Sequence, residues 1–415
     1  MADDEATTGL PAAKRVAAAL NDRADELADA ERREEALVVY GDVLARIPQD
    51  VKDPRLRMER ARALLSLGIT YGELGRVTDA IAAYDATAAE FGGDEDPGVL
   101  ARVAWALHNK AHALANDGRA ERALATYDEV RDRFGGAEGL GLVEHVRRAL
   151  IDKGLLLNEL GRQEEAIAEL ETAAALRGAE PTATHESVRA LVALAFAQSE
   201  SGRDRAAIST SDRALAAIGN NETMESRRLI ATALYNKMNS LTRLGQVSEA
   251  LLVQQSLFSR FAHDLDEDLR GSVVDSLIVR GAILEAEDTL DEAYAAWRDA
   301  AALATPTSVG RERSARARAF MARAMAQHGD LAEAVRTHSE VIDDLSDNAV
   351  GKEIRLHLAR SLYDRGVVLE RLTRLDDALA SYREVVARFA DDEEPEIAQI
   401  LAYSRSRCEF LEEEA

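Results

Sequence analysis

A turn motif that recurs about every 43 residues constrains the fold of this 415-residue chain more than any other feature. In "ELGRVTDAI" the turn residue Gly75 is followed five residues later by Ala80 and then by Ile81. The frame occurs nine times, with successive spacings of 44, 43, 43, 41, 43, 43, 41 and 44 residues, at Glu31, Gly75, Gly118, Gly161, Gly202, Gly245, Asp288, Gly329 and Thr373. A unit of this length cannot bury a core alone, so the pattern predicts stacked copies.

Each copy places large and small side chains at the same distances from its turn. A leucine usually stands eleven residues before the turn and a glycine or alanine seven before it, as at Leu64 and Gly68. An aromatic residue stands nine after the turn at Tyr40, Tyr84, Tyr127, Trp297 and Tyr382. Apolar spacings of three and four predict two helices per copy. A turn glycine ends the first helix by adopting positive φ, and the alanine five residues later lets the second helix approach closely.

The pattern therefore predicts an all-α chain with three segments. Residues 1–9 form an acidic N-terminus that we expect to be disordered, and residues 10–393 form one continuous solenoid of nine repeats. First helices are predicted to begin near residues 11, 54, 97, 138, 181, 222, 266, 308 and 347. Residues 394–415 align with the start of a further copy and predict a single capping helix, which keeps the end of a solenoid soluble.

The quoted leucine, small residue, turn glycine, alanine and aromatic resemble the tetratricopeptide-repeat (TPR) family, a helix–turn–helix of 34 residues. Each copy here has seven to ten residues more, or about two helical turns. In this respect the chain is similar to the long repeats of kinesin light chains. The resemblance implies a right-handed superhelical solenoid in which the first helix of each repeat lines a concave groove. Such a groove binds a peptide segment or the surface of a protein partner.

A charged position recurs eight residues before the turn, and three of the six lysines occupy it. An acidic residue lies 25 positions before each of these lysines, on the second helix of the preceding copy. The predicted structural inter-repeat pairs are Asp85–Lys110, Asp128–Lys153 and Asp212–Lys237. Half-buried pairs of this kind add little net stability but help to fix which helices dock together. Contact with a ligand is the alternative role for the lysines.

The resemblance also implies that residues 13, 10, 9, 6, 3 and 2 before each turn face the groove. Tryptophan, tyrosine and arginine are common binding anchors, and an asparagine amide can donate and accept at once. The candidate groove residues are Arg62, Trp105, His108, Asn109, His112, Asn116, Arg148, Arg189, Tyr235, Asn236, Asn239, Arg316, Arg360 and Tyr363. The alternative is a solvated inner wall, in which acids neutralise the arginines, as Glu144–Arg148 and Glu312–Arg316 could at i,i+4 spacing.

Composition narrows the classes of partner. The net charge of −24 disfavours nucleic acid and anionic lipid. No apolar run approaches the roughly 20 residues that span a bilayer, and the acidic N-terminus lacks the apolar core of a secretory signal. A single cysteine, Cys408, fits a reducing compartment, so we expect a cytoplasmic protein. The preference for arginine over lysine and the abundance of alanine are typical of a GC-rich bacterial genome.

No catalytic or cofactor motif is found in the sequence. Phosphate-binding, dinucleotide-binding and nucleophile-elbow patterns are missing, and His108 and His112 lack a third metal ligand. We therefore expect no enzyme, no cofactor and no metal. The function that we expect is a non-catalytic scaffold or adaptor that binds a protein or peptide in the groove. The alternative is a peptide-responsive regulatory sensor whose superhelix changes on binding.

Overall fold

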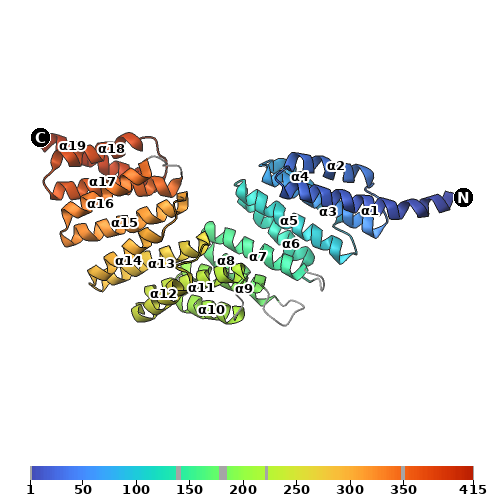
Figure 1. Cartoon of the computed structure of the whole chain (residues 1–415), viewed down its shortest axis with the longest axis horizontal. Helices are drawn as coiled ribbons and strands as arrows, with labels where there is room; N and C mark the ends of the chain where they lie inside the picture. Colours follow the sequence, from blue (N-terminus) through green and yellow to red (C-terminus); the bar gives the residue numbers. More distant parts are fainter. Residues whose placement is uncertain (1, 137–141, 177–184, 220–222, 347–350, 415) are drawn as a thin grey trace. The chain divides into compact units, whose positions relative to one another are not determined.

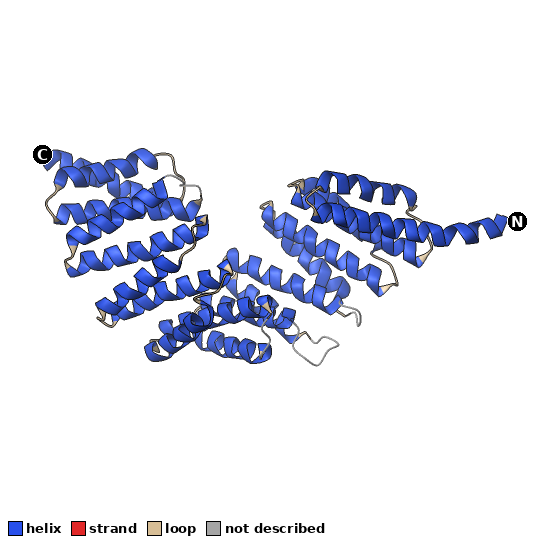
Figure 2. Ribbon diagram, viewed as in Figure 1, coloured by secondary structure: helices blue, strands red, loops and turns tan. Residues whose placement is uncertain are grey.

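The computed structural model describes residues 2–136, 142–176, 185–219, 223–346 and 351–414. Within these ranges the chain forms helices joined by short loops, without a strand (Figure 2). The predicted helix starts at 138, 181, 222 and 347 lie outside the described residues. The chain divides into two compact units, Met1–Gly219 and Asn220–Ala415, which we call the N-terminal unit and the C-terminal unit.

The N-terminal unit holds five consecutive helix pairs (Figure 1). Its helices are α1 Ala2–Asp29, α2 Arg33–Arg46, α3 Pro54–Glu73, α4 Val77–Phe91, α5 Pro97–Asn116, α6 Ala120–Phe134, α7 Leu142–Glu159, α8 Gln163–Ala175, α9 His185–Glu200 and α10 Asp204–Ile218. Whereas the sequence prediction left residues 1–9 outside the first helix, α1 begins at Ala2 and carries Pro11 in its interior. Acidic residues near a helix start interact favourably with the helix dipole, which fits this longer first helix.

The C-terminal unit holds four further pairs and a last single helix (Figure 1). Its helices are α11 Met224–Arg243, α12 Val247–Phe261, α13 Glu267–Ala286, α14 Leu290–Leu303, α15 Ser308–His328, α16 Leu331–Ser346, α17 Lys352–Arg371, α18 Leu375–Arg388 and α19 Pro395–Glu414. Helix α19 packs on α17 and α18, where the sequence predicted a terminal helix. None of the described helices has the length and apolarity that a membrane crossing requires.

Within each unit the helices stack in one regular order. Every helix packs against the next one in the chain, and each first helix also packs against the first helix of the following pair, as α3 does on α5 and α15 on α17. This is the contact pattern of an α-solenoid, in which each pair contacts only its neighbours. The prediction of an all-α solenoid of helix–turn–helix repeats is thereby confirmed.

The nine turn residues share one backbone conformation. All have positive φ, including the three that are not glycine: Glu31 at 60°, Asp288 at 61° and Thr373 at 59°. After Gly75 the backbone amide of Arg76 donates to the carbonyl of Tyr71 at 2.9 Å, which is the hydrogen bond of a Schellman cap. Glu, Asp and above all the β-branched Thr adopt this conformation less readily than glycine, so the stacked helices on both sides must hold these three turns.

The small residue before the turn lies against the aromatic residue after it. A Cβ at Gly68 would lie 2.4 Å from a ring carbon of Tyr84, and one at Gly281 would lie 2.3 Å from the indole nitrogen of Trp297. No real side chain tolerates such distances, so the ring excludes anything larger than glycine at these two positions. The pairing explains why the sequence keeps a small residue seven before the turn.

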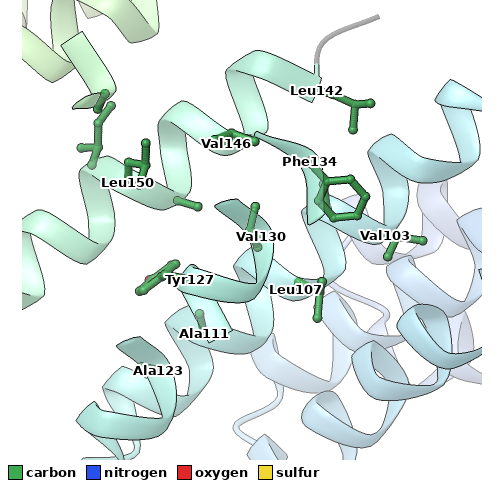
Figure 3. Close-up of a cluster of buried hydrophobic side chains, with 14 of the residues drawn as sticks. Val103, Leu107, Ala111, Ala123, Tyr127, Val130, Phe134, Leu142, Val146 and Leu150 are labelled. Atoms are coloured by element: carbon green, nitrogen blue, oxygen red, sulfur yellow. The ribbon is translucent and has the colours of Figure 1, made fainter. Parts of the chain in front are cut away.

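The core is shared between successive pairs. Figure 3 shows Val103 and Leu107 of α5, Tyr127 and Val130 of α6, and Leu150 of α7 gathered in one cluster. All five are at most 2 % exposed. Because one cluster draws on three helices from two repeats, a single repeat leaves its apolar face uncovered.

A clamp between an arginine and an aspartate fixes three of the connections to the next first helix. In each case one carboxylate oxygen contacts the arginine, and the other accepts from the backbone amide two residues on, as at Asp94 and Asp96 with 2.9 Å. The clamps are Arg57–Asp94, Arg227–Asp264 and Arg355–Asp392. Burial raises the pKa of Asp94, but the amide and guanidinium hydrogen bonds outweigh this effect, and the pKa lies below its ordinary value. We name these contacts the Arg–Asp clamps.

Candidate functional site

The candidate groove residues fall in both units, all of them on first helices. Those of the N-terminal unit are Arg62, Trp105, His108, Asn109, His112, Asn116, Arg148 and Arg189. Those of the C-terminal unit are Tyr235, Asn236, Asn239, Arg316, Arg360 and Tyr363. The densest set lies on α5, α7 and α9, and we call it the α5–α7–α9 cluster: Trp105, His108, His145, Arg148, Asp152, Glu186 and Arg189.

Asp152 is the centre of this cluster. His108 Nε2 lies 2.7 Å from its Oδ2, and Arg189 Nη2 lies 2.5 Å from its Oδ1. Burial raises the pKa of Asp152, but the hydrogen bond from His108 and the charge of Arg189 outweigh burial and hold the pKa below its ordinary value. The carboxylate therefore stays ionised and links α5, α7 and α9.

The charged chain continues along α9 to Glu186. Its Oε2 accepts from Arg189 Nη1 at 3.2 Å, and its Oε1 accepts from Arg148 Nε at 2.7 Å. Arg189 thus bridges two carboxylates, and Arg148 of α7 is held by an acid of the next first helix. Alternating charges over three helices form a nearly neutral wall whose arginines already have partners.

An aromatic pair borders this wall, of which Trp105 is exposed and His145 half-buried. The ring of Trp105 stacks on His145 with centroids 6.1 Å apart and an interplanar angle of 27°. Trp105 is 41 % exposed, which is unusual for the largest apolar side chain. Burial, together with repulsion from Arg148 and His108, lowers the pKa of His145 to about 4. The imidazole is therefore neutral at pH 7 and presents a flat, uncharged surface beside the indole.

The amides of α5 have different surroundings. Asn109 interacts with the hydroxyl of Tyr84 of α4 and lowers its pKa, although burial outweighs this effect. Asn116 Nδ2 lies 3.2 Å from His112 Nδ1, and both residues are exposed. Asn116 and His112 therefore keep hydrogen-bonding capacity for a ligand, whereas Asn109 already uses part of its own.

The candidate residues of the C-terminal unit are less accessible. Asn236 is only 4 % exposed, and Asn239 hydrogen bonds to the hydroxyl of Tyr235. Tyr363 packs between Tyr382 and Tyr403, with ring centroids 5.6 Å and 6.3 Å away. These residues stabilise the first helices from within, and they leave fewer free polar groups than α5 does.

The row of arginines thirteen before the turn is neutralised by neighbouring repeats. Arg62 lies 2.8 Å from Asp22 and 2.5 Å from Asp25, while Arg316 contacts Asp275 and Arg360 contacts Glu396. The acids are not the ones expected at i,i+4 spacing.

Glu144 instead contacts Arg147 at 3.1 Å, and Arg316 contacts Asp275 rather than Glu312. The reason is that Arg148 and Arg316 reach an acid of the adjacent first helix rather than one of their own helix. The alternative of a neutralised wall thus describes the arginine row better than a free carboxylate-binding row does.

The recurring lysines contact the predicted acids where both partners belong to one unit. Lys110 Nζ lies 2.6 Å from Asp85, and Lys153 Nζ lies 2.6 Å from both Asp128 and Glu169. Asp212 belongs to the N-terminal unit and Lys237 to the C-terminal unit, so their pairing stays a prediction.

Three members of the cluster were missing from the sequence-based set: Asp152, which stands in the row nine before the turn, and His145 and Glu186, which share one position outside the rows. His145 and Glu186 both stand sixteen residues before their turns, one helical turn beyond the outermost row taken from the shorter family repeat. Arg313, at the same distance before Gly329, contacts Asp275 at 3.0 Å. The signal was the length of the repeat, because the additional turns extend the first helices and with them the surface they present.

The cluster offers an aromatic surface and hydrogen bonds rather than a reactive group. His108 is held by Asp152, as a base would be, but no nucleophile among the described residues lies within hydrogen-bond reach of its ring in this structure. Such a surface suits the binding of a peptide or protein, in which aromatic anchors contribute most of the free energy.

Comparison with known sequences supports the repeat assignment locally. A family model described as "Tetratricopeptide repeat" matches residues 148–179, which include α8 and part of α7. No match was found among curated protein sequences.

Comparison with solved structures shows the fold. The apo form of the quorum sensor NprR from B. thuringiensis aligns over 86% of this chain and 96% of its own, with a TM-score of 0.53 and 15% identity. The apo form of RapI aligns over 85% of this chain and 98% of its own, with a TM-score of 0.53 and 11% identity. A signal-transduction ATPase with a TPR sensor from Pyrococcus horikoshii aligns over 90% of this chain but 49% of its own, with a TM-score of 0.50 and 13% identity. The fold is thus that of TPR solenoids.

Proposed function

We propose that this chain is a non-catalytic scaffold or adaptor that binds a peptide segment or the surface of a protein partner on its first helices. The observation that carries the proposal is the exposed Trp105, stacked on a neutral His145 beside the ion-paired wall. A monomer leaves a large aromatic side chain in water at some cost in free energy, and such residues are typical anchors of interfaces. His112 and Asn116 supply exposed hydrogen-bonding groups about two and three helical turns further along α5.

The experiment uses the two tryptophans of the chain. Trp297 is fully buried in the C-terminal unit, so a change in tryptophan emission on binding reports mainly on Trp105. Partners are captured from a lysate by the full chain, purified and titrated back. We expect a shift of the emission to shorter wavelength, and a loss of affinity of about tenfold or more in Trp105→Ala.

A matched control tests the location. Val38 of α2 is 73 % exposed on a second helix, and Val38→Ala should leave affinity unchanged. A captured partner that binds Trp105→Ala as tightly as the unchanged chain, or that loses affinity in Val38→Ala, would show that the first helices are not the binding surface.

A peptide-responsive sensor is the second candidate. The fold is shared with a protein described as a quorum sensor, which makes a signalling peptide a reasonable first ligand to test. A sensor should change its radius of gyration in X-ray scattering when a short peptide binds, whereas a scaffold should change little.

We also propose the finer placement that the sequence suggested: a long-repeat variant similar to kinesin light chains, working in the cytoplasm of a bacterium. The support is the turn spacing of 41 to 44 residues, the single cysteine and the arginine-rich, alanine-rich composition.

A further inference from the structure

Aspartates nine residues before the turn are paired by neighbouring first helices in the N-terminal unit. Asp152 is bound by His108 of the preceding first helix and by Arg189 of the following one. Asp22 stands at the same position of the first repeat, and Arg62 of the next first helix contacts it at 2.8 Å. The solenoid thus supplies a counter-ion for this carboxylate in both cases.

Asp364 of α17 is the third aspartate at this position, nine residues before Thr373, and it differs from the other two. Its carboxylate makes no hydrogen bond and no ion pair within the part of the chain that the structure describes. His108 belongs to the repeat before that of Asp152 and stands ten residues before its turn. In the repeat before that of Asp364, the same position on α15 is Ala319. The repeat that adjoins Asp364 therefore lacks the donor that Asp152 has.

The two arginines whose charges act on this carboxylate are Arg323 and Arg360, and both have other contacts. Arg360 contacts Glu396. The guanidinium of Arg323 lies over the ring of Phe320, 4.7 Å from its centroid. Burial accordingly raises the pKa of Asp364 to about 6, and Arg323 and Arg360 offset only part of this effect.

Aromatic residues stand next to Asp364 on α17 and on the helices α15 and α19 that pack against it. Phe320 occupies the same repeat position on α15 as Asp364 on α17, and Tyr363 precedes it in the chain. The ring of Tyr403, which is 52 % exposed, lies 6.3 Å from that of Tyr363. A carboxylate beside accessible aromatic rings suits a guanidinium or ammonium group, which gains both a charged hydrogen bond and a cation–π contact.

We propose that Asp364 receives an arginine or lysine side chain of a bound segment, which takes the place that His108 and Arg189 take at Asp152. The inference rests on the proposed function, because it assumes that the first helices bind a polypeptide. It adds that the ligand must be cationic at one position, in keeping with the strongly acidic chain.

The test selects short random peptides displayed on phage against the full chain and against its Asp364→Asn variant. Asp376→Asn, an exposed aspartate on α18, is the matched control for the loss of one negative charge. We expect the peptides selected by the unchanged chain to share one arginine or lysine. Replacing that arginine by citrulline, or that lysine by norleucine, should weaken binding about tenfold in the unchanged chain and in Asp376→Asn, and not at all in Asp364→Asn.

A second variant gives Asp364 a hydrogen-bond donor from the chain itself. Ala319→His places an imidazole at the position of His108, where it should occupy Asp364 and reduce the arginine preference. Because the variant introduces a charged hydrogen bond instead of removing one, loss of folding is not the expected outcome.

Two results would overturn the inference, and they are distinguishable. If peptides bind and alter Trp105 emission but citrulline costs the same affinity in the unchanged chain and in Asp364→Asn, the assignment of Asp364 is wrong while the proposed function stands. If the unchanged chain enriches no peptide and captures no partner, the proposed function fails and the inference fails with it.

Discussion

Asp152 of the N-terminal unit and Asp364 of the C-terminal unit occupy the same position of the repeat, but their surroundings are opposite. Asp152 accepts from an imidazole and a guanidinium, and its pKa lies below the ordinary value. Asp364 accepts from no described residue, and its pKa rises to about 6. The backbone of the repeat therefore determines the position of the carboxylate. One or two side chains on adjacent helices determine whether the ionised carboxylate stabilises or destabilises the folded chain.

The comparison also separates two uses of charge in a solenoid. A paired charge between first helices fixes the docking of one repeat on the next. An unpaired, partly buried charge destabilises the ligand-free protein, and it gains a counter-ion only when a ligand provides one. The following predictions test this distinction, beginning with the largest expected effect.

Lys153, a buried charge of α7 that contacts acids on neighbouring helices, should give the largest effect. Its side chain is 9 % exposed and contacts Asp128 and Glu169 at 2.6 Å. Lys153→Met leaves both carboxylates short of a partner, and we expect a loss of about 3 kcal/mol of unfolding free energy in urea denaturation. Adding Asp128→Leu should recover part of this loss.

Lys110→Met is the matched control, because its partner Asp85 is 53 % exposed and the pair should contribute only about 0.5–1 kcal/mol. Equal losses at Lys110 and Lys153, or strictly additive losses in the Lys153 and Asp128 double variant, would contradict the ion-pair interpretation.

Asp152→Asn should cost about 2 kcal/mol at pH 7, because two charged donors lose their carboxylate. The same substitution at Asp364 should not destabilise. Both are measured by urea denaturation at the same pH, with circular dichroism as the probe. The comparison breaks down if the two substitutions change the unfolding free energy in the same direction.

The pH dependence should reveal the unpaired carboxylate directly. Because the pKa of Asp364 is raised in the folded chain, its contribution to stability is fully present below pH 4 and is lost as the pH rises through about 6. Asp364→Asn should therefore be neutral at pH 4 and stabilising by about 1–2 kcal/mol at pH 7.5, allowing for its partial exposure to solvent.

The charged groups near Asp364 are the guanidinium groups of Arg323 and Arg360. The hydroxyl of Tyr363 is also nearby, and burial raises its pKa above the ordinary value. A pH-independent difference between the unchanged chain and Asp364→Asn contradicts the assignment of an unpaired, buried carboxylate.

The smallest effect is expected from transplanting the donor. Ala319→His should stabilise the C-terminal unit by about 1 kcal/mol near pH 6, since it recreates the hydrogen bond that Asp152 receives from His108. In this background the pH-dependent gain from Asp364→Asn should disappear. If that gain persists, the position of Ala319 is not equivalent to that of His108.

Much of the fold could be predicted from the sequence because the same turn motif and apolar spacing occur nine times. The turns, the small residue against an aromatic and the inter-repeat lysine contacts at Lys110 and Lys153 are all local consequences of spacing. The division after Gly219 gave no such signal, since the turn spacing continues at 43 residues between Gly202 and Gly245.

The site was predicted less well for a geometric reason. Which row a residue belongs to can be counted along the chain, but the partner of a long side chain depends on how the next helix is placed. Arg148 and Arg316 therefore contact acids of neighbouring helices rather than their own. His145 was not predicted because the rows were taken from a shorter repeat.

The Arg–Asp clamps have a mechanical consequence. They tie the loop after a second helix to the first helix of the same repeat at Asp94, Asp264 and Asp392, so load applied along the chain must break a charged contact before these connections extend. Connections held by apolar packing alone yield more readily under force. When the chain is pulled from its two ends, the three connections with an Arg–Asp clamp should therefore extend later than connections without one.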